Sequence, residues 1–187
     1  MAIKPILLNG HMVDAILDGR KTVMRQVVKG LENEKRLWEA FEQEGRERLP
    51  MAKGPYAHGD VLWVRETWAQ VNGVYYYRAD DRENLGVFGG WCPSIHMPRE
   101  AARIWLRVTS IRVERLQAID EAGAEAEGGQ VLIWHGKTDR TARQDFKLIW
   151  DATLKPMDRN RYCWKANPWV WVIEFERCEK PTCAVSS

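Results

Sequence analysis

A short basic segment near the amino end holds the residues whose types and spacing best suit chemistry. Within six positions it places the cations Arg20, Lys21 and Arg25 beside the hydroxyl of Thr22. Gly19 suits the left-handed residue that ends a helix, so these side chains are expected at a junction between a helix and a strand. Side chains at such junctions can project from a fixed backbone into a cleft. The segment predicts an anion or nucleotide contact, and a solvated basic turn is the alternative.

A second candidate lies on the strand predicted over residues 103–115. Arg103, Trp105 and Arg107 are two residues apart and share one strand face. Two cations beside an indole favour single-stranded nucleic acid, which needs phosphate neutralisation next to a stacking surface. The alternative is that Trp105 packs under a helix at the rim while the arginines reach solvent.

Carboxylates crowd the short helix predicted over residues 120–127. Glu121 lies in its first turn, where the helix dipole favours a negative charge. Glu127 lies in the last turn, where the same dipole disfavours one. Glu127 therefore indicates either a functional role or a basic partner such as Lys21.

His96 and Ser94 lie on a long loop predicted over residues 79–100. The chain has no Gly-x-Ser-x-Gly pattern, which argues against a serine hydrolase, so His96 is expected to donate a hydrogen bond at a cleft. It also has no phosphate-binding loop and no dinucleotide fingerprint. The four cysteines and four histidines complete no zinc pattern. We therefore expect neither a cofactor nor a metal.

The elements that must position these residues are mostly strands. Strands are predicted over residues 4–8, 22–28, 61–65, 74–77, 103–115 and 169–175, and short helices over 11–17, 120–127 and 140–153. Residues 61–65 are apolar on both faces and therefore central. The apolar phase switches near Thr109 and Ser110, which predicts a bulge. Five to six mainly antiparallel strands with short helices at the rim predict an α+β domain on a small, strongly bent or closed sheet.

The 187 residues indicate one domain over 1–178, with a helical insertion at about 30–55 and a flexible tail at 179–187. In the insertion, acid-before-base pairs at helical spacing and a thin apolar stripe predict a surface helix. A net charge of +2 means that any nucleic-acid binding must come from local patches. With no long apolar run, we expect a cytoplasmic protein with no membrane contact. The sequence does not indicate the oligomeric state.

Several segments in this order resemble the ASCH-domain family, in the versions carried by bacteriophages and prophages. The matching segments are residues 4–7, 16–22, 59–68, 94–98, 120–128 and 167–175. The most specific feature is the Gly-Arg-Lys-Thr segment together with Gly-Asp-x-Leu-x-Val. The resemblance covers nearly the whole chain and is weakest over residues 30–55. It implies a PUA-like small β-barrel, related to folds that bind RNA, with a cleft near the Gly-Arg-Lys-Thr segment.

Some small members of that family are amidohydrolases that act on N(4)-acetylcytidine, and others are reported as ribonucleases. The amidohydrolases use a lysine, a glutamate and a threonine, which the resemblance places at Lys21, Glu127 and Met24. A thioether is neither a nucleophile nor a proton carrier, so Met24 departs from the pattern. Thr22 could replace the hydroxyl only if the substrate sat about 7 Å along the strand. Water activated between Lys21 and Glu127 is the other route.

Two hypotheses follow from these residues. In the first, a basic, aromatic-edged cleft binds RNA, single-stranded DNA or a modified nucleoside without chemistry. Its expected border is Lys21, Arg25, Arg65, Glu66, Trp68 and Glu127, with Arg20, His96, Arg103, Trp105 and Arg107 as further contacts. In the second, the protein is an amidohydrolase or ribonuclease that uses Lys21 and Glu127 with Thr22 or water.

Overall fold

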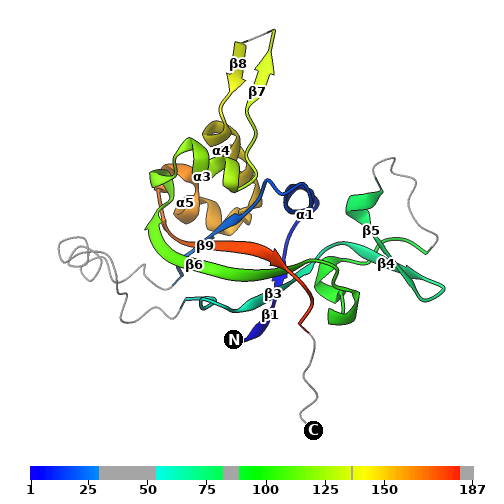
Figure 1. Cartoon of the computed structure of the whole chain (residues 1–187). Coiled ribbons are helices and arrows are strands. Elements are labelled where there is room, and N and C mark those ends of the chain that lie inside the picture. The colour runs from blue at the N-terminus through cyan, green and yellow to red at the C-terminus, as the bar shows by residue number, and fades with distance from the viewer. Residues whose placement is uncertain (30–53, 82–88, 136, 182–187) are drawn as a thin grey trace.

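The computed structural model describes residues 1–29, 54–81, 89–135 and 137–181. Five strands form the main sheet in the order β1-β3-β6-β9-β2, and Figure 1 shows β6 and β9 curving together. β1 runs parallel to β3, and the other neighbours are antiparallel. The strands are β1 (Ile3–Leu7), β2 (Val23–Val27), β3 (Val61–Arg65), β6 (Trp105–Arg115) and β9 (Trp169–Cys178). The expected α+β class, with a mainly antiparallel sheet and short helices, is confirmed.

Two details of the sheet follow from the apolar pattern. β3 lies between β1 and β6, as its two apolar faces predicted. The register of β6 against β9 shifts between Val108 and Ser110, which confirms the predicted bulge. The bulge lets Leu106 and Val108 on one side of it and Ile111 on the other contact the same core.

The helices begin where polar side chains satisfy their first N–H groups. Asn9 caps α1 (Gly10–Leu17) and Asp120 caps α3 (Glu121–Ala126). Thr141 begins α4 (Ala142–Thr153) with a capping box that includes Gln144. α5 (Arg159–Tyr162) is a single turn. Among the described residues, no helix is long and apolar enough to cross a membrane.

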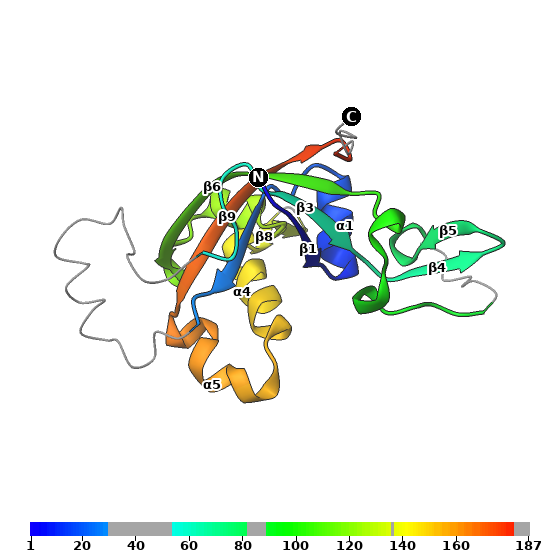
Figure 2. The same cartoon turned by 90° about the horizontal axis from the view of Figure 1, so that it is seen from below.

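The core divides into three apolar clusters. The first lies between α1 and the sheet and includes Ile16, Met24 and Ile173. The second lies where α3 and α4 cover the opposite face of β2 and β9, at Val23 and Val172. The third gathers around Trp105 beside three short 3-10 turns, Arg78–Asp80, Ser94–His96 and Arg99–Ala101. Figure 2 shows α1 and α4 at separate places along the sheet.

Two hairpins extend from this body. The first joins β4 (Trp68–Val71) to β5 (Val74–Tyr77), and the second joins β7 (Leu132–Trp134) to β8 (Lys137–Arg140). Only β5 was predicted, from its unbroken run of β-branched and aromatic residues. β4 and β8 contain polar residues in place of such a run, and β7 has only three residues. The helix expected in the insertion at 30–55 falls almost wholly outside the described residues, as does the tail beyond residue 181.

Candidate functional site

The basic segment follows the end of α1. Gly19 has a φ of +75°, the left-handed conformation expected of it. The backbone N–H groups of Arg20 and Lys21 both donate to the Ala15 carbonyl, at 2.8 and 2.9 Å. The turn leaves Arg20 exposed, 3.0 Å from the Asp18 carboxylate, while Lys21 is buried. The two neighbouring cations therefore have different environments.

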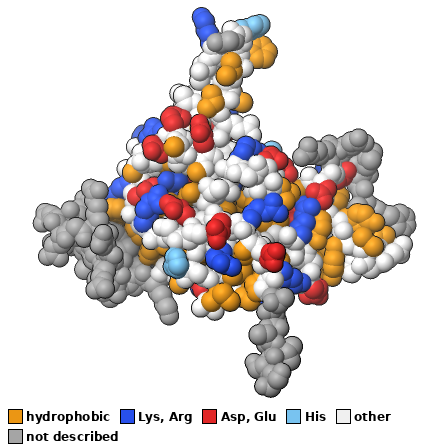
Figure 3. All heavy atoms as spheres, in the orientation of Figure 1, with side chains coloured by type: hydrophobic (Ala, Val, Ile, Leu, Met, Phe, Trp, Pro, Cys, Tyr) orange, Lys and Arg blue, Asp and Glu red, His pale blue; other side chains and the backbone are white. Residues whose placement is uncertain are grey.

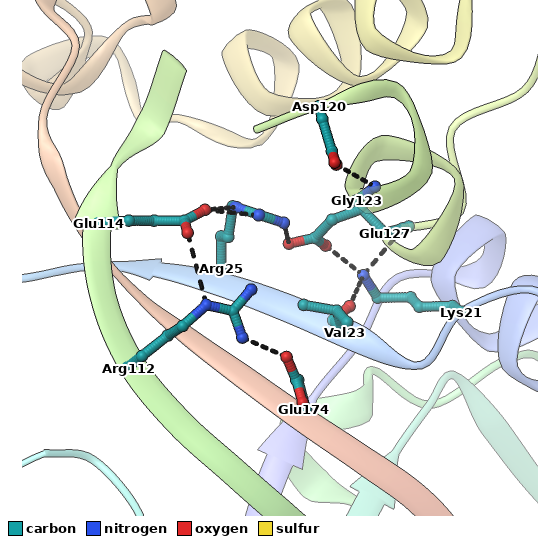
Figure 4. A network of polar contacts seen from close by, with 9 residues as sticks. All are labelled: Lys21, Val23, Arg25, Arg112, Glu114, Asp120, Gly123, Glu127 and Glu174. Carbon is teal, nitrogen blue, oxygen red and sulfur yellow. Dashed lines mark hydrogen bonds and ion pairs between the residues drawn. The ribbon is translucent and has the colours of Figure 1, made fainter. Parts of the chain in front are cut away.

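Lys21 meets Glu127 inside the molecule, as Figure 4 shows. The Lys21 ammonium lies 2.6 Å from Glu127 Oε2 and also donates to the backbone carbonyls of Glu127 and Val23, at 2.9 and 2.8 Å. An ammonium has three N–H donors, so each has an acceptor. The two side chains are only 1% and 4% exposed. The structure thus brings together the two residues that the resemblance linked to catalysis, as a closed ion pair.

A chain of further ion pairs continues from Glu127. Its Oε1 lies 3.3 Å from Arg25 Nη1, and the Arg25 guanidinium donates twice to Glu114 Oε1, at 2.6 and 3.1 Å. Arg112 joins Glu114 to Glu174 at the exposed end (Figure 4). We call this set the ion-pair network, in which three cations alternate with three carboxylates: Lys21, Glu127, Arg25, Glu114, Arg112 and Glu174.

The network connects α3 to the sheet. Glu127 lies at the carboxyl end of α3, where the helix dipole disfavours its negative charge. Two buried cations, Lys21 just before β2 and Arg25 within it, compensate for this. Lys21 and Arg25 reach the Glu127 carboxylate because they lie on the same side of the chain as Val23, which packs under α3 and α4. A buried charge is tolerated only with such partners.

The two candidate hydroxyl positions lie elsewhere. Met24 is 6% exposed and packs with Ile16 and Ile173 in the first cluster, on the opposite face of β2 from Val23. Thr22 is exposed, whereas the Lys21 side chain is closed to solvent. In this conformation a hydroxyl at position 24 would therefore enter the core and not the surroundings of Lys21 and Glu127.

Glu66 and Arg103 form a second buried pair. Glu66 is 2% exposed, and the guanidinium of Arg103 donates to both of its oxygens, at 2.8 and 2.9 Å. Arg103 also donates to Asp80 at 2.7 Å and lies over the Tyr77 ring, 4.0 Å from its centroid. Burial alone would lower the pKa of Arg103, but the hydrogen bonds to Glu66 and Asp80 raise it above its ordinary value. Arg103 therefore stays charged and fixes β6 to the segment that follows β3.

Arg65 occupies a more open position beside that pair. Its Nε donates to the Ser94 carbonyl at 3.1 Å, and its guanidinium lies 5.4 Å from the centroid of the Trp63 ring. His96, in the same 3-10 turn as Ser94, is exposed. Arg65 is therefore connected, by its hydrogen bond to Ser94, to the turn that carries His96.

Trp105 belongs to the core. It is 3% exposed, and its indole N–H donates to the Ala102 carbonyl at 3.1 Å, so its ring is not an open stacking surface. Its cross-strand neighbour is Trp63. Arg99 and Lys180 lie over the Trp105 ring, 5.5 and 5.9 Å from its centroid. Trp105 thus packs inside, but its two arginine neighbours differ: Arg107 is exposed, whereas Arg103 is paired with Glu66.

Cations surround this pair of tryptophans. Arg99, Arg107 and Lys180 are exposed, and Arg65 is half-buried. Arg107 lies two residues along β6 from Trp105 and has Val61 and Glu176 as cross-strand neighbours. We call this set the cationic patch: Arg65, Arg99, Arg107 and Lys180. Figure 3 shows basic and acidic side chains mixed over the pictured face.

Trp68 is half-buried on the first hairpin. It packs against Tyr75, with ring centroids 5.8 Å apart, and Trp68 and Cys92 exchange two backbone hydrogen bonds, at 3.2 and 2.7 Å. Its indole nitrogen is buried and has no hydrogen-bond partner within the described part of the chain. Trp68 contributes to the third cluster together with Trp63.

Sequence reasoning missed several residues of both sites. Glu114, Arg112 and Glu174 were not singled out, although their charges on otherwise apolar strands were the available signal. Arg99 and Lys180 were missed because the fold, and not sequence spacing, brings them to Trp105. A separate hollow of about 350 Å³ is lined by Asp151, Ala152, Arg159 and Cys163. None of the predicted site residues lines it, and the described residues contain no cluster able to hold a metal ion.

Comparisons with known proteins find only distant likenesses. No family model matches the chain, and no curated protein matches it. Among solved structures, an ASCH domain from Lactobacillus crispatus is similar over 94% of this chain and 79% of its own, at 10% identity and a TM-score of 0.47. A DUF984 protein from Enterococcus faecalis is similar over 95% of this chain and 76% of its own, at 10% identity and a TM-score of 0.43.

Proposed function

We propose that this chain binds single-stranded nucleic acid, RNA or DNA, through the cationic patch, and that the ion-pair network is structural. The observation that carries this proposal is the contrast between two sets of cations. Lys21 is closed to solvent and donates all three of its hydrogen bonds within the protein. Arg99, Arg107 and Lys180 are exposed. Arg99 and Lys180 lie over the Trp105 ring, Arg65 lies over the Trp63 ring, and Arg107 follows two residues along β6 from Trp105.

The chemistry of the patch suits a single strand. Exposed guanidinium and ammonium groups neutralise phosphates, and Arg65 over Trp63 combines a flat cation with an aromatic ring. Both groups can contact a base by stacking, which requires no particular sequence. His96, in the turn that Arg65 contacts, is exposed and offers an imidazole for a further hydrogen bond to the nucleic acid.

A fluorescence titration tests this proposal. Quenching of tryptophan emission is followed as single-stranded RNA or DNA is added to the wild-type protein and to Arg65→Ala. We expect the variant to bind about five- to tenfold more weakly, because it loses one phosphate contact and one stacking surface. The matched control is Lys147→Ala, an exposed cation of α4. Failure of the wild-type protein to bind either nucleic acid at low salt would overturn the proposal.

The 2.6 Å contact between Lys21 and Glu127 favours a second candidate, a hydrolase of N(4)-acetylcytidine or of RNA. That reaction needs a nucleophile and a proton acceptor that substrate can reach. The closed pair, the exposed Thr22 and the core position of Met24 argue against it. Incubating the protein with N(4)-acetylcytidine and following cytidine release by chromatography tests it. Release that Lys21→Met abolishes, in a variant shown to be folded, would establish the hydrolase and refute the binding-only account.

A further inference from the structure

The hairpin of β7 and β8 projects from the body near α3 and α4, as Figure 1 shows. Its first strand exposes large apolar side chains, with Ile133 68% and Trp134 71% exposed. Figure 3 shows apolar side chains along the same projection. It forms a two-stranded sheet, so within the described residues both of its edges lack a strand partner. An apolar hairpin with free edges is a template for pairing with another strand.

The outer edge of β8 can pair with a second copy of itself. Trp134 is the register partner of Lys137 across a connection of two residues, and Ile133 is the partner of Thr138. The register shifts between Leu132 and Ile133, which places an irregularity at Asp139 of β8 and leaves the ladder regular from Trp134 to Ile133. Within that regular part, residues alternate between bonding inward and bonding outward. Because the pair that flanks a two-residue connection bonds inward, Thr138 is expected to direct its N–H and C=O to the free edge.

The charges of β8 select one register for this pairing. With Thr138 facing its own copy across a two-fold axis, Lys137 of one copy comes beside Asp139 of the other, where the register of β8 is irregular, and the reverse pair forms by symmetry. Both side chains are exposed. The two neighbouring registers with the same outward bonding place Asp139 against Asp139 or Lys137 against Lys137, and like charges disfavour both. The pattern is therefore self-complementary in the way that a two-fold interface requires.

We propose that the chain forms a weak homodimer by antiparallel pairing of β8 with β8, which makes a four-stranded sheet from two hairpins. Ile133 and Thr138 share one face of the hairpin, so on that face the paired sheet presents two central threonines flanked by two isoleucines. The short strands bury little area, so the association is expected to depend on concentration. This inference is independent of the proposed function.

Sedimentation equilibrium of the full chain, from about 10 µM to about 1 mM, tests the dimer. We expect the average mass to rise from that of one chain toward that of two. Lys137→Asp or Asp139→Lys alone turns two attractive contacts into two repulsive ones and should weaken the dimer at least about tenfold. The exchange variant, Lys137→Asp with Asp139→Lys, restores opposite charges and should recover wild-type association to within about threefold.

Lys147→Glu, which reverses an exposed charge on α4, is the control and should leave association unchanged. Circular dichroism establishes that each variant is folded. A single-chain mass at every concentration overturns the proposal, as does a dimer insensitive to the two charge reversals or one that the exchange variant fails to recover. A monomer whose nucleic-acid binding falls on Trp134→Ala also overturns it and assigns the hairpin to nucleic acid.

Discussion

Glu127 Oε2 lies 2.6 Å from the Lys21 ammonium, and its other oxygen lies 3.3 Å from Arg25. One carboxylate therefore links two buried cations that come from the end of α1 and from β2. Removing either cation leaves the buried Glu127 carboxylate with one cationic partner in place of two, which costs more than an exposed ion pair contributes. The role of this carboxylate in holding α3 to the sheet can be measured.

Lys21→Met should lower the free energy of unfolding by about 3–5 kcal/mol, because Glu127 loses its closest partner while staying buried. Urea denaturation followed by circular dichroism measures the change. Lys147→Met is the matched control and should stay within about 0.5 kcal/mol of wild type. Combining Lys21→Met with Glu127→Gln should cost less than the sum of the two single changes. Additive costs would show that the two residues are not coupled.

Met24→Thr distinguishes two interpretations of Met24, as a core residue or as a catalytic position that has lost its threonine. Since Met24 packs in the first cluster, the substitution leaves a cavity and buries a hydroxyl, and should destabilise the protein by about 2–4 kcal/mol. Thr22→Val, at the neighbouring exposed position, should change stability by less than about 0.5 kcal/mol. Thermal melts compare the two variants. Hydrolysis of N(4)-acetylcytidine that appears only with Met24→Thr would contradict the core assignment.

Glu66→Gln and Asp80→Asn compare the two carboxylates that bind Arg103, one buried and one exposed. Glu66 accepts two hydrogen bonds from Arg103 and its side chain is 3% exposed, so its neutralisation should cost about 2–4 kcal/mol. Asp80→Asn removes a partner of the same arginine whose side chain is 57% exposed, and should cost less than about 1 kcal/mol. Equal costs in chemical denaturation would mean that burial does not distinguish the two contacts.

The lowered pKa of Asp60 predicts that the stability of the fold depends on pH in the acid range. Its hydrogen bond with Lys4 and those from the backbone N–H groups of Ala2 and Ala57 lower its pKa from 3.8 to about 2. A carboxyl whose pKa is lower in the folded state stabilises the fold above its unfolded pKa and loses this contribution as pH falls toward the folded value. Wild type should therefore lose stability relative to Asp60→Asn between about pH 4 and about pH 2. If the melting temperatures of wild type and Asp60→Asn fall equally across that pH range, the lowered pKa of Asp60 is contradicted.

The sequence predicted the strands in which β-branched, aliphatic or aromatic residues run together. β3 and β5 have the predicted bounds, β6 has its bulge at the predicted place, and Gly19 ends the turn after α1 as expected. β8 was missed because its four residues are all polar, and β7 was missed because it has only three residues.

The Lys21–Glu127 pair was predictable from the sequence, but its burial was not. A glutamate at the end of α3 indicated a basic partner, and Lys21 is that partner. Spacing could not show that Lys21 is closed to solvent, which depends on how α3 packs on β2. Nor could it show that Met24 faces the core, which depends on how α1 packs on the opposite face. The same limit explains why Trp105 was open to two interpretations before its surroundings were known.

The salt dependence of nucleic-acid binding tests the central claim most directly. The logarithm of the association constant for a single-stranded oligonucleotide is measured against the logarithm of salt concentration for wild type and for Arg65→Ala. We predict a negative slope that becomes shallower by about 0.7 in the variant, because each phosphate contact to a single strand contributes about that amount. Absent binding, or a slope unchanged by Arg65→Ala, would contradict a nucleic-acid site on the cationic patch.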